Sequence, residues 1–204
     1  YDNWKKEIEF IFNQQVQNIK DNKNYIIIES EGYSNFHPAW SPSNQKIAFI
    51  SDKEHDYFGR SDLFIYDLND SSSTKIQAGV RTSPAWINDS LLVYSKRSEH
   101  NQNGSKFFNL YSYDLILEEE EQLTEDMRLI SPVFNSSTEQ IFTINTFDGT
   151  SNIIAGNSDF TSFEQLTNFN NGIQIFSLTL DDSLIIYDAV INHERDLYYL
   201  NIFS

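Results

Sequence analysis

The chain has 204 residues, of which 39% are hydrophobic, so it is long enough to form one domain with a buried core. Its formal net charge of −16 makes nucleic acid and anionic membrane surfaces unfavourable partners. Cysteine is absent, which excludes disulfides, thiolate metal sites and cysteine nucleophiles.

Residues 1–24 are predicted to form an amphipathic linker helix. Five apolar residues lie three or four positions apart, as on one face of a helix: Trp4, Ile8, Phe12, Val16 and Ile19. We expect this face to pack against another part of the protein. No apolar run of about 18 residues occurs, so the sequence predicts no membrane span. Because the sequence begins within this helix without Met and ends just after a strand-like run, we expect both ends to lie inside a longer protein.

From Tyr25 onward the sequence predicts short strands. Runs of β-branched and aromatic residues alternate with clusters of Asn, Asp, Ser and Gly, a pattern typical of strands joined by tight turns. Related segments recur at 36–51, 82–95, 130–145 and 176–189. Successive segments are 46, 48 and 45 residues apart, measured between Pro38, Pro84, Pro132 and Ser177. This period indicates propeller blades or solenoid repeats.

Each period contains further strand-like runs. They lie at 62–68, 109–115, 151–157 and 196–202, and then at 74–78, 121–125 and 164–168. The segment 25–30 stands where the last strand of a preceding blade would be. Four strands per period predict an all-β fold, a β-propeller of about four four-stranded antiparallel blades that form a partial ring or a fragment. Within a propeller domain of residues 25–204, we place the blades at about 32–79, 80–126, 127–172 and 173–204.

A proline and an aromatic residue mark the first strand of three repeats. Proline can begin a strand because its missing N–H costs no ladder hydrogen bond there. The aromatic residue two places later shares the proline's face, and we expect it to fill the space between blades. These repeat anchors are Pro38, Trp40, Pro84, Trp86, Pro132 and Phe134.

The run PAWSPSNQKIAFIS, followed by LFIYDL and by QLT in the next two repeats, resembles the TolB-like (WD-repeat-like) β-propeller repeat over residues 25–204. The resemblance implies a bacterial envelope, periplasmic or secreted protein with a protein or peptide partner. Members of that family have six blades. We therefore expect that further chain completes the ring, or that open blade edges pair with another domain.

The junction before the first repeat carries a second resemblance. The resemblance is carried by Trp4 in the helix and by Glu31, Gly32 and Tyr33 before the repeat. At these residues the junction resembles that of bacterial proteins in which a gluzincin-type metallopeptidase domain precedes a TolB-like propeller. This resemblance implies a peptidase upstream of Tyr1.

The sequence shows no catalytic or cofactor motif. The four histidines, His37, His55, His100 and His193, are scattered, and no H-E-x-x-H occurs, so no metal site is expected. The G-x-S-x-G elbow and the glycine-rich nucleotide loops are also absent, so we expect no catalytic residue and no cofactor in this segment.

Residues just before the anchor prolines are the candidate binding residues, because loops at this end of the innermost strands surround a propeller's channel. They are Asn35, His37, Arg81 and Arg128. The two arginines would attract a carboxylate or a peptide C-terminus, although ordinary pairing with surface acids is the alternative.

These observations predict a non-catalytic module that binds a protein or peptide, or serves as a scaffold. The alternative is the accessory propeller of a secreted or outer-membrane-associated metallopeptidase. A glycan-binding propeller is a third hypothesis, weakened because most aromatic residues occupy anchor and strand positions.

Overall fold

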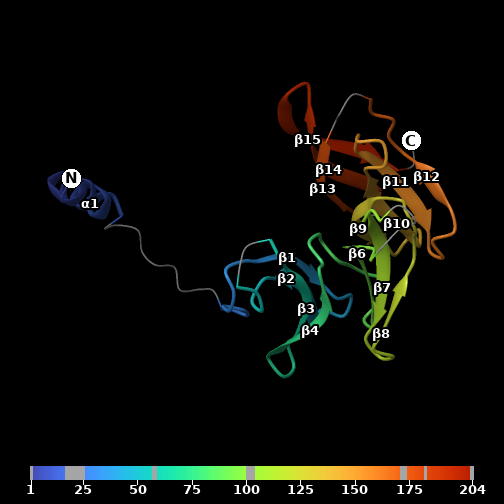
Figure 1. The fold of residues 1–204 in the computed structure, drawn as a ribbon, viewed down its shortest axis with the longest axis horizontal. Coiled ribbons are helices and arrows are strands. Elements are labelled where there is room, and N and C mark those ends of the chain that lie inside the picture. Colours follow the sequence, from blue (N-terminus) through green and yellow to red (C-terminus); the bar gives the residue numbers. More distant parts are fainter. Residues whose placement is uncertain are drawn as a thin grey trace.

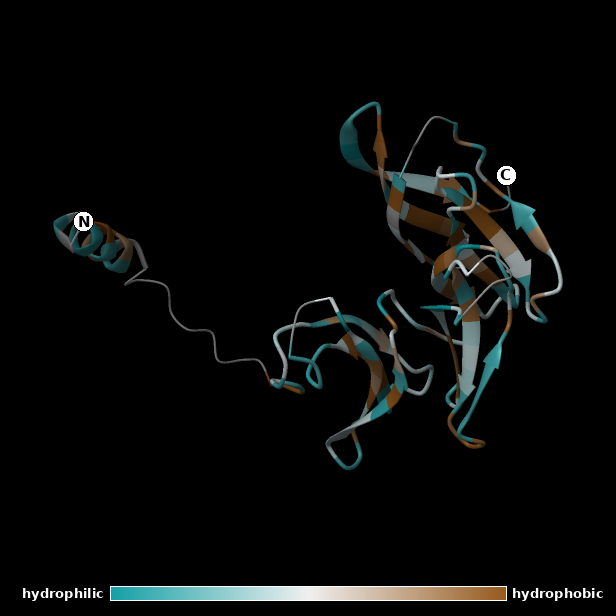
Figure 2. Ribbon diagram, in the orientation of Figure 1, coloured by the Kyte–Doolittle hydropathy of each residue, from teal (hydrophilic) through white to brown (hydrophobic). Residues whose placement is uncertain are grey.

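The computed structural model describes residues 2–16, 26–56, 59–99, 104–170, 174–181 and 183–202. These residues form one N-terminal helix and four antiparallel sheets that follow one another as propeller blades (Figure 1). The predicted all-β propeller with an N-terminal helix is thus confirmed. Figure 2 shows hydrophobic residues concentrated in the strands and hydrophilic residues in the connecting loops.

Each blade is built from strands that pair in chain order. Blade 1 contains β1 (Asn35–Trp40), β2 (Lys46–Ser51), β3 (Asp62–Asp67) and β4 (Ser72–Ala78). Blade 2 contains β5 (Ala85–Trp86), β6 (Leu91–Arg97), β7 (Phe108–Asp114) and β8 (Glu119–Gln122). Blade 3 contains β9 (Leu129–Asn135), β10 (Gln140–Asn145), β11 (Asn152–Asn157) and β12 (Phe163–Gln165). Blade 4 has three strands in the described chain, β13 (Gln174–Leu180), β14 (Leu184–Ile191) and β15 (Glu194–Asn201).

The hydrophobic core lies between the blades. Alternate residues of a strand point to opposite faces, and a blade between two neighbours buries both faces. Accordingly, every residue of β11 from Asn152 to Gly156 is buried. One cluster joins blades 1 and 2 around Ile50 and Tyr94, a second joins blades 2 and 3, and a third joins blades 3 and 4.

A bulge interrupts the first strand of blades 1 and 3 at the residue before the anchor proline. The pairing register shifts between Phe36 and Ala39 on β1, and His37 there has a φ of 53°. Blade 3 repeats this geometry, because Ser131 before Pro132 also has a φ of 53°. A left-handed backbone is strained for both residue types, so the surrounding pairs must hold it.

The helix α1 (Asp2–Val16) lies away from the sheets (Figure 1). Its apolar Trp4, Ile8 and Phe12 are 61%, 44% and 63% exposed, so the expected packing is not found in the described part of the chain. Positions 17–24 of the predicted helix lie outside the described residues. The helix is too short and too polar to cross a bilayer.

The strand expected at 25–30 is wrong for residues 26–30, which form no ladder. A strand needs an edge to pair with, and this segment is instead held against blade 1 by the side chain of Glu29. The Glu29 carboxylate accepts hydrogen bonds from Lys53 Nζ at 2.7 Å and from Ser73 Oγ at 2.8 Å.

Candidate functional site

Several loops meet at one end of each blade. Because neighbouring strands are antiparallel, the start of the first strand, the loop from the second to the third and the connection to the next blade share one edge. We call this the loop edge; in blades 1 and 2 it comprises described residues within 52–61, 79–84, 98–107 and 123–128. All four predicted binding residues lie at or beside it.

Asn35 and His37 lie on β1 of blade 1. Asn35 Nδ2 donates a hydrogen bond to the carbonyl oxygen of Glu31 at 3.0 Å. The His37 ring meets the Phe36 ring edge-on, with centroids 5.0 Å apart. Desolvation lowers the pKa of the His37 imidazole, which favours its neutral form.

Arg128 is held between two aromatic rings. Its guanidinium carbon lies 4.1 Å from the ring centroid of Phe107 and 5.5 Å from that of Phe147. Its Nη1 also donates to the carbonyl oxygen of Phe147 at 3.1 Å. Arg128 therefore joins a loop of blade 2 to a turn of blade 3, and this role occupies much of its guanidinium.

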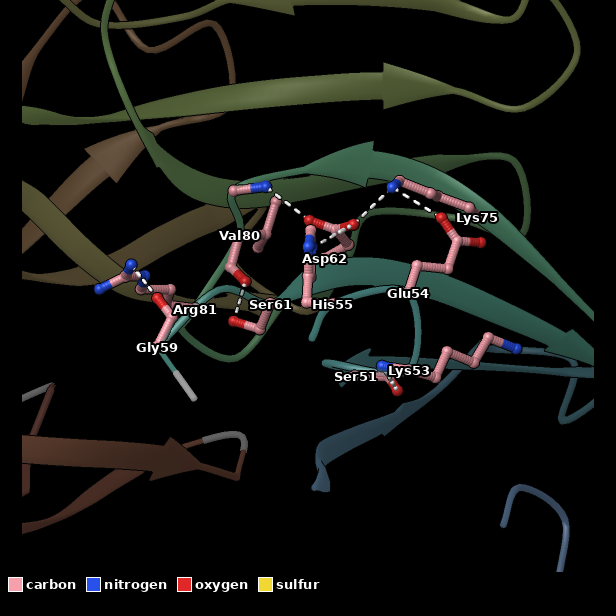
Figure 3. A network of polar contacts seen from close by, with 11 residues as sticks. Ser51, Lys53, Glu54, His55, Gly59, Ser61, Asp62, Lys75, Val80 and Arg81 are labelled. Atoms are coloured by element: carbon pink, nitrogen blue, oxygen red, sulfur yellow. Dashed lines mark hydrogen bonds and ion pairs between the residues drawn. The ribbon is translucent and has the colours of Figure 1, made fainter. Parts of the chain in front are cut away.

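Arg81 lines a groove of about 750 Å³ between blades 1 and 2 at the loop edge. The side chain donates a hydrogen bond to the carbonyl oxygen of Gly59, which fixes its position (Figure 3). Asn35, His37 and Arg128 lie outside this groove. The lining residues are His55, Arg60, Ser61, Asp62, Gln77, Ala78, Gly79, Arg81, Lys96, Arg97, Ser98, Glu99, Lys106 and Phe108.

The groove is basic although the chain is strongly acidic. Five of its lining residues are Lys or Arg, from a total of ten such residues after position 25, and two are acids. Lys96 is paired with Glu120 at 2.6 Å. Asp62 is paired with Lys75 at 2.5 Å. Besides the members of these two pairs, the lining contains the cations Arg60, Arg81, Arg97 and Lys106 and the acid Glu99.

Asp62 organises the floor of the groove. Its carboxylate accepts hydrogen bonds from the Gly79 N–H at 3.0 Å and from His55 Nε2 at 3.0 Å, in addition to the Lys75 pair (Figure 3). Burial alone would raise the pKa of Asp62, but the donors from Lys75, Gly79 and His55 outweigh it and lower the pKa. Lys75 also bonds to Glu54 at 2.9 Å. The negative charge of Asp62 is therefore compensated by groups of the protein itself.

The same clamp recurs in blades 2 and 3 with an amide in place of the carboxylate. Asn109 Oδ1 accepts from the Met127 N–H at 3.1 Å, and Asn152 Oδ1 accepts from the Phe169 N–H at 2.8 Å. Each clamp ties the first part of a third strand to the connection that leads to the next blade. Asp62 thus has the same structural role as these two asparagines, and its carboxylate also bonds two side chains, those of Lys75 and His55.

Our sequence reasoning missed Arg60, Arg97 and Lys106 as members of this site. A signal was available, because these residues occupy the ends of predicted strands or their loops on the same side as Arg81. The pattern of residues before the anchor prolines does not include them. Which two blades face each other across a groove is decided by the stacking of the sheets.

A larger groove of about 910 Å³ lies between the same blades at the opposite edge, lined by hairpin turns. Its Lys46 is paired with Asp67, and it also contains Asp70, Asp89 and Glu118. With Lys46 and Lys75 against four acids, its lining is acidic, as is the chain as a whole. Within the described ranges, no three His, Asp or Glu residues are grouped so that they could hold a metal ion.

No family model and no curated protein matches the sequence. Among solved structures, TolB from Acinetobacter baumannii is similar with a TM-score of 0.70 and 17% identity, covering 91% of this chain and 45% of that one. A putative TolB from Agrobacterium tumefaciens has a TM-score of 0.67 and 14% identity, covering 85% of this chain and 64% of that one. A puromycin-hydrolyzing peptidase from Mycobacterium tuberculosis has a TM-score of 0.71 and 11% identity, covering 91% and 30%.

The chain spans less than two thirds of each of these structures. At such identities, structural likeness establishes the fold and leaves function to the site. On this basis, the chain has the fold of the TolB-like β-propellers.

Proposed function

We propose that this chain is a non-catalytic protein- or peptide-binding module, or scaffold, of a bacterial envelope or secreted protein. The basic groove between blades 1 and 2 carries the proposal, because it gathers half of the propeller's cations at one loop edge. Loops on a rigid scaffold are where propellers place their ligand sites. The likeness to TolB structures supports a periplasmic or secreted location.

We also propose that the open faces of the terminal blades pair with further sheet, either from the same protein or from another domain. Trp40 on blade 1 is 55% exposed, and Leu197 and Tyr199 on the edge strand of blade 4 are 77% and 76% exposed. Exposed apolar faces and unpaired edge strands favour association with another sheet.

The second candidate is an accessory propeller of a metallopeptidase whose catalytic domain lies elsewhere in the protein. The exposed apolar residues of α1 favour it, because such a helix is stabilised by packing on another domain. The propeller's likeness to a peptidase structure agrees with this role.

A pull-down from envelope extracts with the full-length protein tests the main proposal. The comparison is between the unchanged bait, a groove variant (Arg81→Ala with Arg97→Ala) and a charge-matched control in α1 (Lys5→Ala with Lys6→Ala). We expect a partner that the unchanged bait and the control retain, and that the groove variant captures at least tenfold less. Equal capture by all three baits would exclude the groove as the binding site. Cleavage of added peptides by the full-length protein would favour the peptidase alternative.

A further inference from the structure

We propose that the groove between blades 1 and 2 binds an extended peptide segment rich in Asp and Glu. The inference rests on the proposed function and specifies its ligand. Three features support it: an excess of cations, two guanidinium groups that are held in position, and the edge strand β4 beside the groove.

The charge of the groove selects an anion. With Lys96 and Asp62 paired, Arg81, Arg97 and Lys106 outnumber Glu99, the other acid of the lining. The whole chain carries a net charge of −16, and the cations of the groove attract an acidic ligand only within the screening length of about 8 Å at physiological salt. A ligand must therefore enter the groove to gain from it.

Two guanidinium groups are already fixed in position. Arg81 is bonded to the carbonyl oxygen of Gly59, and the Arg97 guanidinium carbon lies 5.1 Å from the ring centroid of Phe108. A planar guanidinium can bond both oxygens of a carboxylate, and a side chain held in place loses less entropy on binding. Both features suit carboxylates better than a diffuse counterion.

The backbone at the groove suits a peptide. Gln77 and Ala78 line it and belong to β4, which is the outer edge strand of blade 1. An edge strand offers N–H and C=O groups to an extended chain, as in β-strand addition. The Phe108 ring already carries Arg97 on its face, so it is a poor stacking platform for a sugar. An acidic peptide therefore fits better than an anionic oligosaccharide.

Fluorescence anisotropy with the full-length protein tests the ligand class. The probe is a labelled ten-residue peptide that alternates Glu with Val, and the matched control peptide alternates Gln with Val. We expect the Glu peptide to bind at least tenfold more tightly than the Gln peptide. Its affinity should fall at least threefold between 50 and 200 mM salt, because salt screens the contacts between the carboxylates and the groove cations. Equal binding of the two peptides would overturn the proposal.

The variants locate the binding. Replacing Arg81 and Arg97 by Ala should weaken Glu-peptide binding at least tenfold, whereas the α1 control, Lys5→Ala with Lys6→Ala, should leave it unchanged. Circular dichroism checks that each variant is folded. A second variant, Arg81→Lys with Arg97→Lys, should recover part of the affinity because the positive charges are kept. An unchanged affinity in the Ala variant would overturn the proposal.

Competition separates the other anions. Polygalacturonate or inorganic phosphate that displaces the Glu peptide at equal charge concentration would overturn the choice of a peptide ligand. If the Glu peptide fails to bind while the pull-down still yields a groove-dependent partner, the ligand class is wrong and the proposed function stands. If both experiments fail, the groove is not the binding site.

Discussion

Trp86 of blade 2 donates a hydrogen bond from its indole Nε1 to the carbonyl oxygen of Ala39 in blade 1, at 3.0 Å. The indole is 7% exposed and belongs to the cluster that joins the two blades. Trp40 has the same place in its own repeat, two residues after a proline, yet it is 55% exposed. The two residues differ in whether a neighbouring sheet covers them.

This difference predicts unequal costs for the same substitution in the 204-residue chain. Trp86→Ala should lower the free energy of unfolding by about 3–5 kcal/mol, because it leaves a cavity between blades. Trp40→Ala should cost less than about 1 kcal/mol, as is usual for an exposed position. Urea unfolding measures both. Equal costs would show that Trp40 is covered in solution.

Glu29 predicts a pH dependence. Burial alone would raise its pKa, but hydrogen bonds from Lys53, the Glu31 N–H and Ser73 outweigh burial and hold the pKa at about 2, below the ordinary 4.5. A lowered pKa stabilises the folded chain above pH 4.5, and this stability is lost as the pH falls towards 2. With solvent screening, the contribution is about 2 kcal/mol at pH 7.

Glu29→Gln therefore should destabilise the chain at pH 7 and have a much smaller effect at pH 2.5, close to the folded pKa. Urea unfolding at the two pH values measures the difference, and Glu31→Gln is the matched control. An equal effect of Glu29→Gln at both pH values would show that the carboxylate charge is not involved.

Asp62 should tolerate an amide better than an apolar side chain. Asp62→Ala removes the acceptor for the Gly79 N–H and leaves Lys75 and His55 without it, at a cost of about 3 kcal/mol. Asp62→Asn keeps an acceptor, as Asn109 does in blade 2, and should cost about 1–2 kcal/mol. The unfolding free energies of the two variants decide this, and similar losses would contradict the equivalence of the three clamps.

Substituting two glycines that both have positive φ distinguishes the cost of backbone strain from the cost of a steric clash. A Cβ on Gly32, at φ 80°, would lie 2.7 Å from Asp52 Oδ1 and 2.7 Å from Lys53 Cα, whereas one on Gly79, at φ 77°, would meet nothing within 4 Å. Gly79→Ala should cost about 1 kcal/mol from the backbone alone. Gly32→Ala should cost at least twice that amount, by the same unfolding measurement. Equal costs would mean that the chain near Asp52 moves aside.

The repeat pattern could be predicted from the sequence because each blade satisfies the same local needs. The Thr of each QLT run illustrates this. Thr124 Oγ1 accepts from the Leu110 N–H at 2.9 Å, and Thr167 Oγ1 accepts from the Ile153 N–H at 2.8 Å. One hydroxyl at one offset serves the same purpose in two blades, so the sequence alone indicates the period and the strands.

The binding groove could not be predicted in this way. The place before Pro84 indicates Arg81, but Arg97 ends β6 and Lys106 lies in the loop after it, and no local pattern connects them to Arg81. Arg128, four residues before Pro132, is expected at the channel in the same way as Arg81 and yet lies between Phe107 and Phe147. Its neighbours depend on how blade 2 meets blade 3.

The sequence by itself determined the strands, the period and the propeller class, because hydrophobic alternation and turn residues act over a few positions. The tertiary structure decided which side chains are covered and which cations share a groove. Trp40 and Trp86 are alike in sequence and differ in burial. The burial of a side chain and the clustering of charges depend on which blade packs against it. Packing between neighbouring blades joins residues that lie about one repeat apart in the sequence.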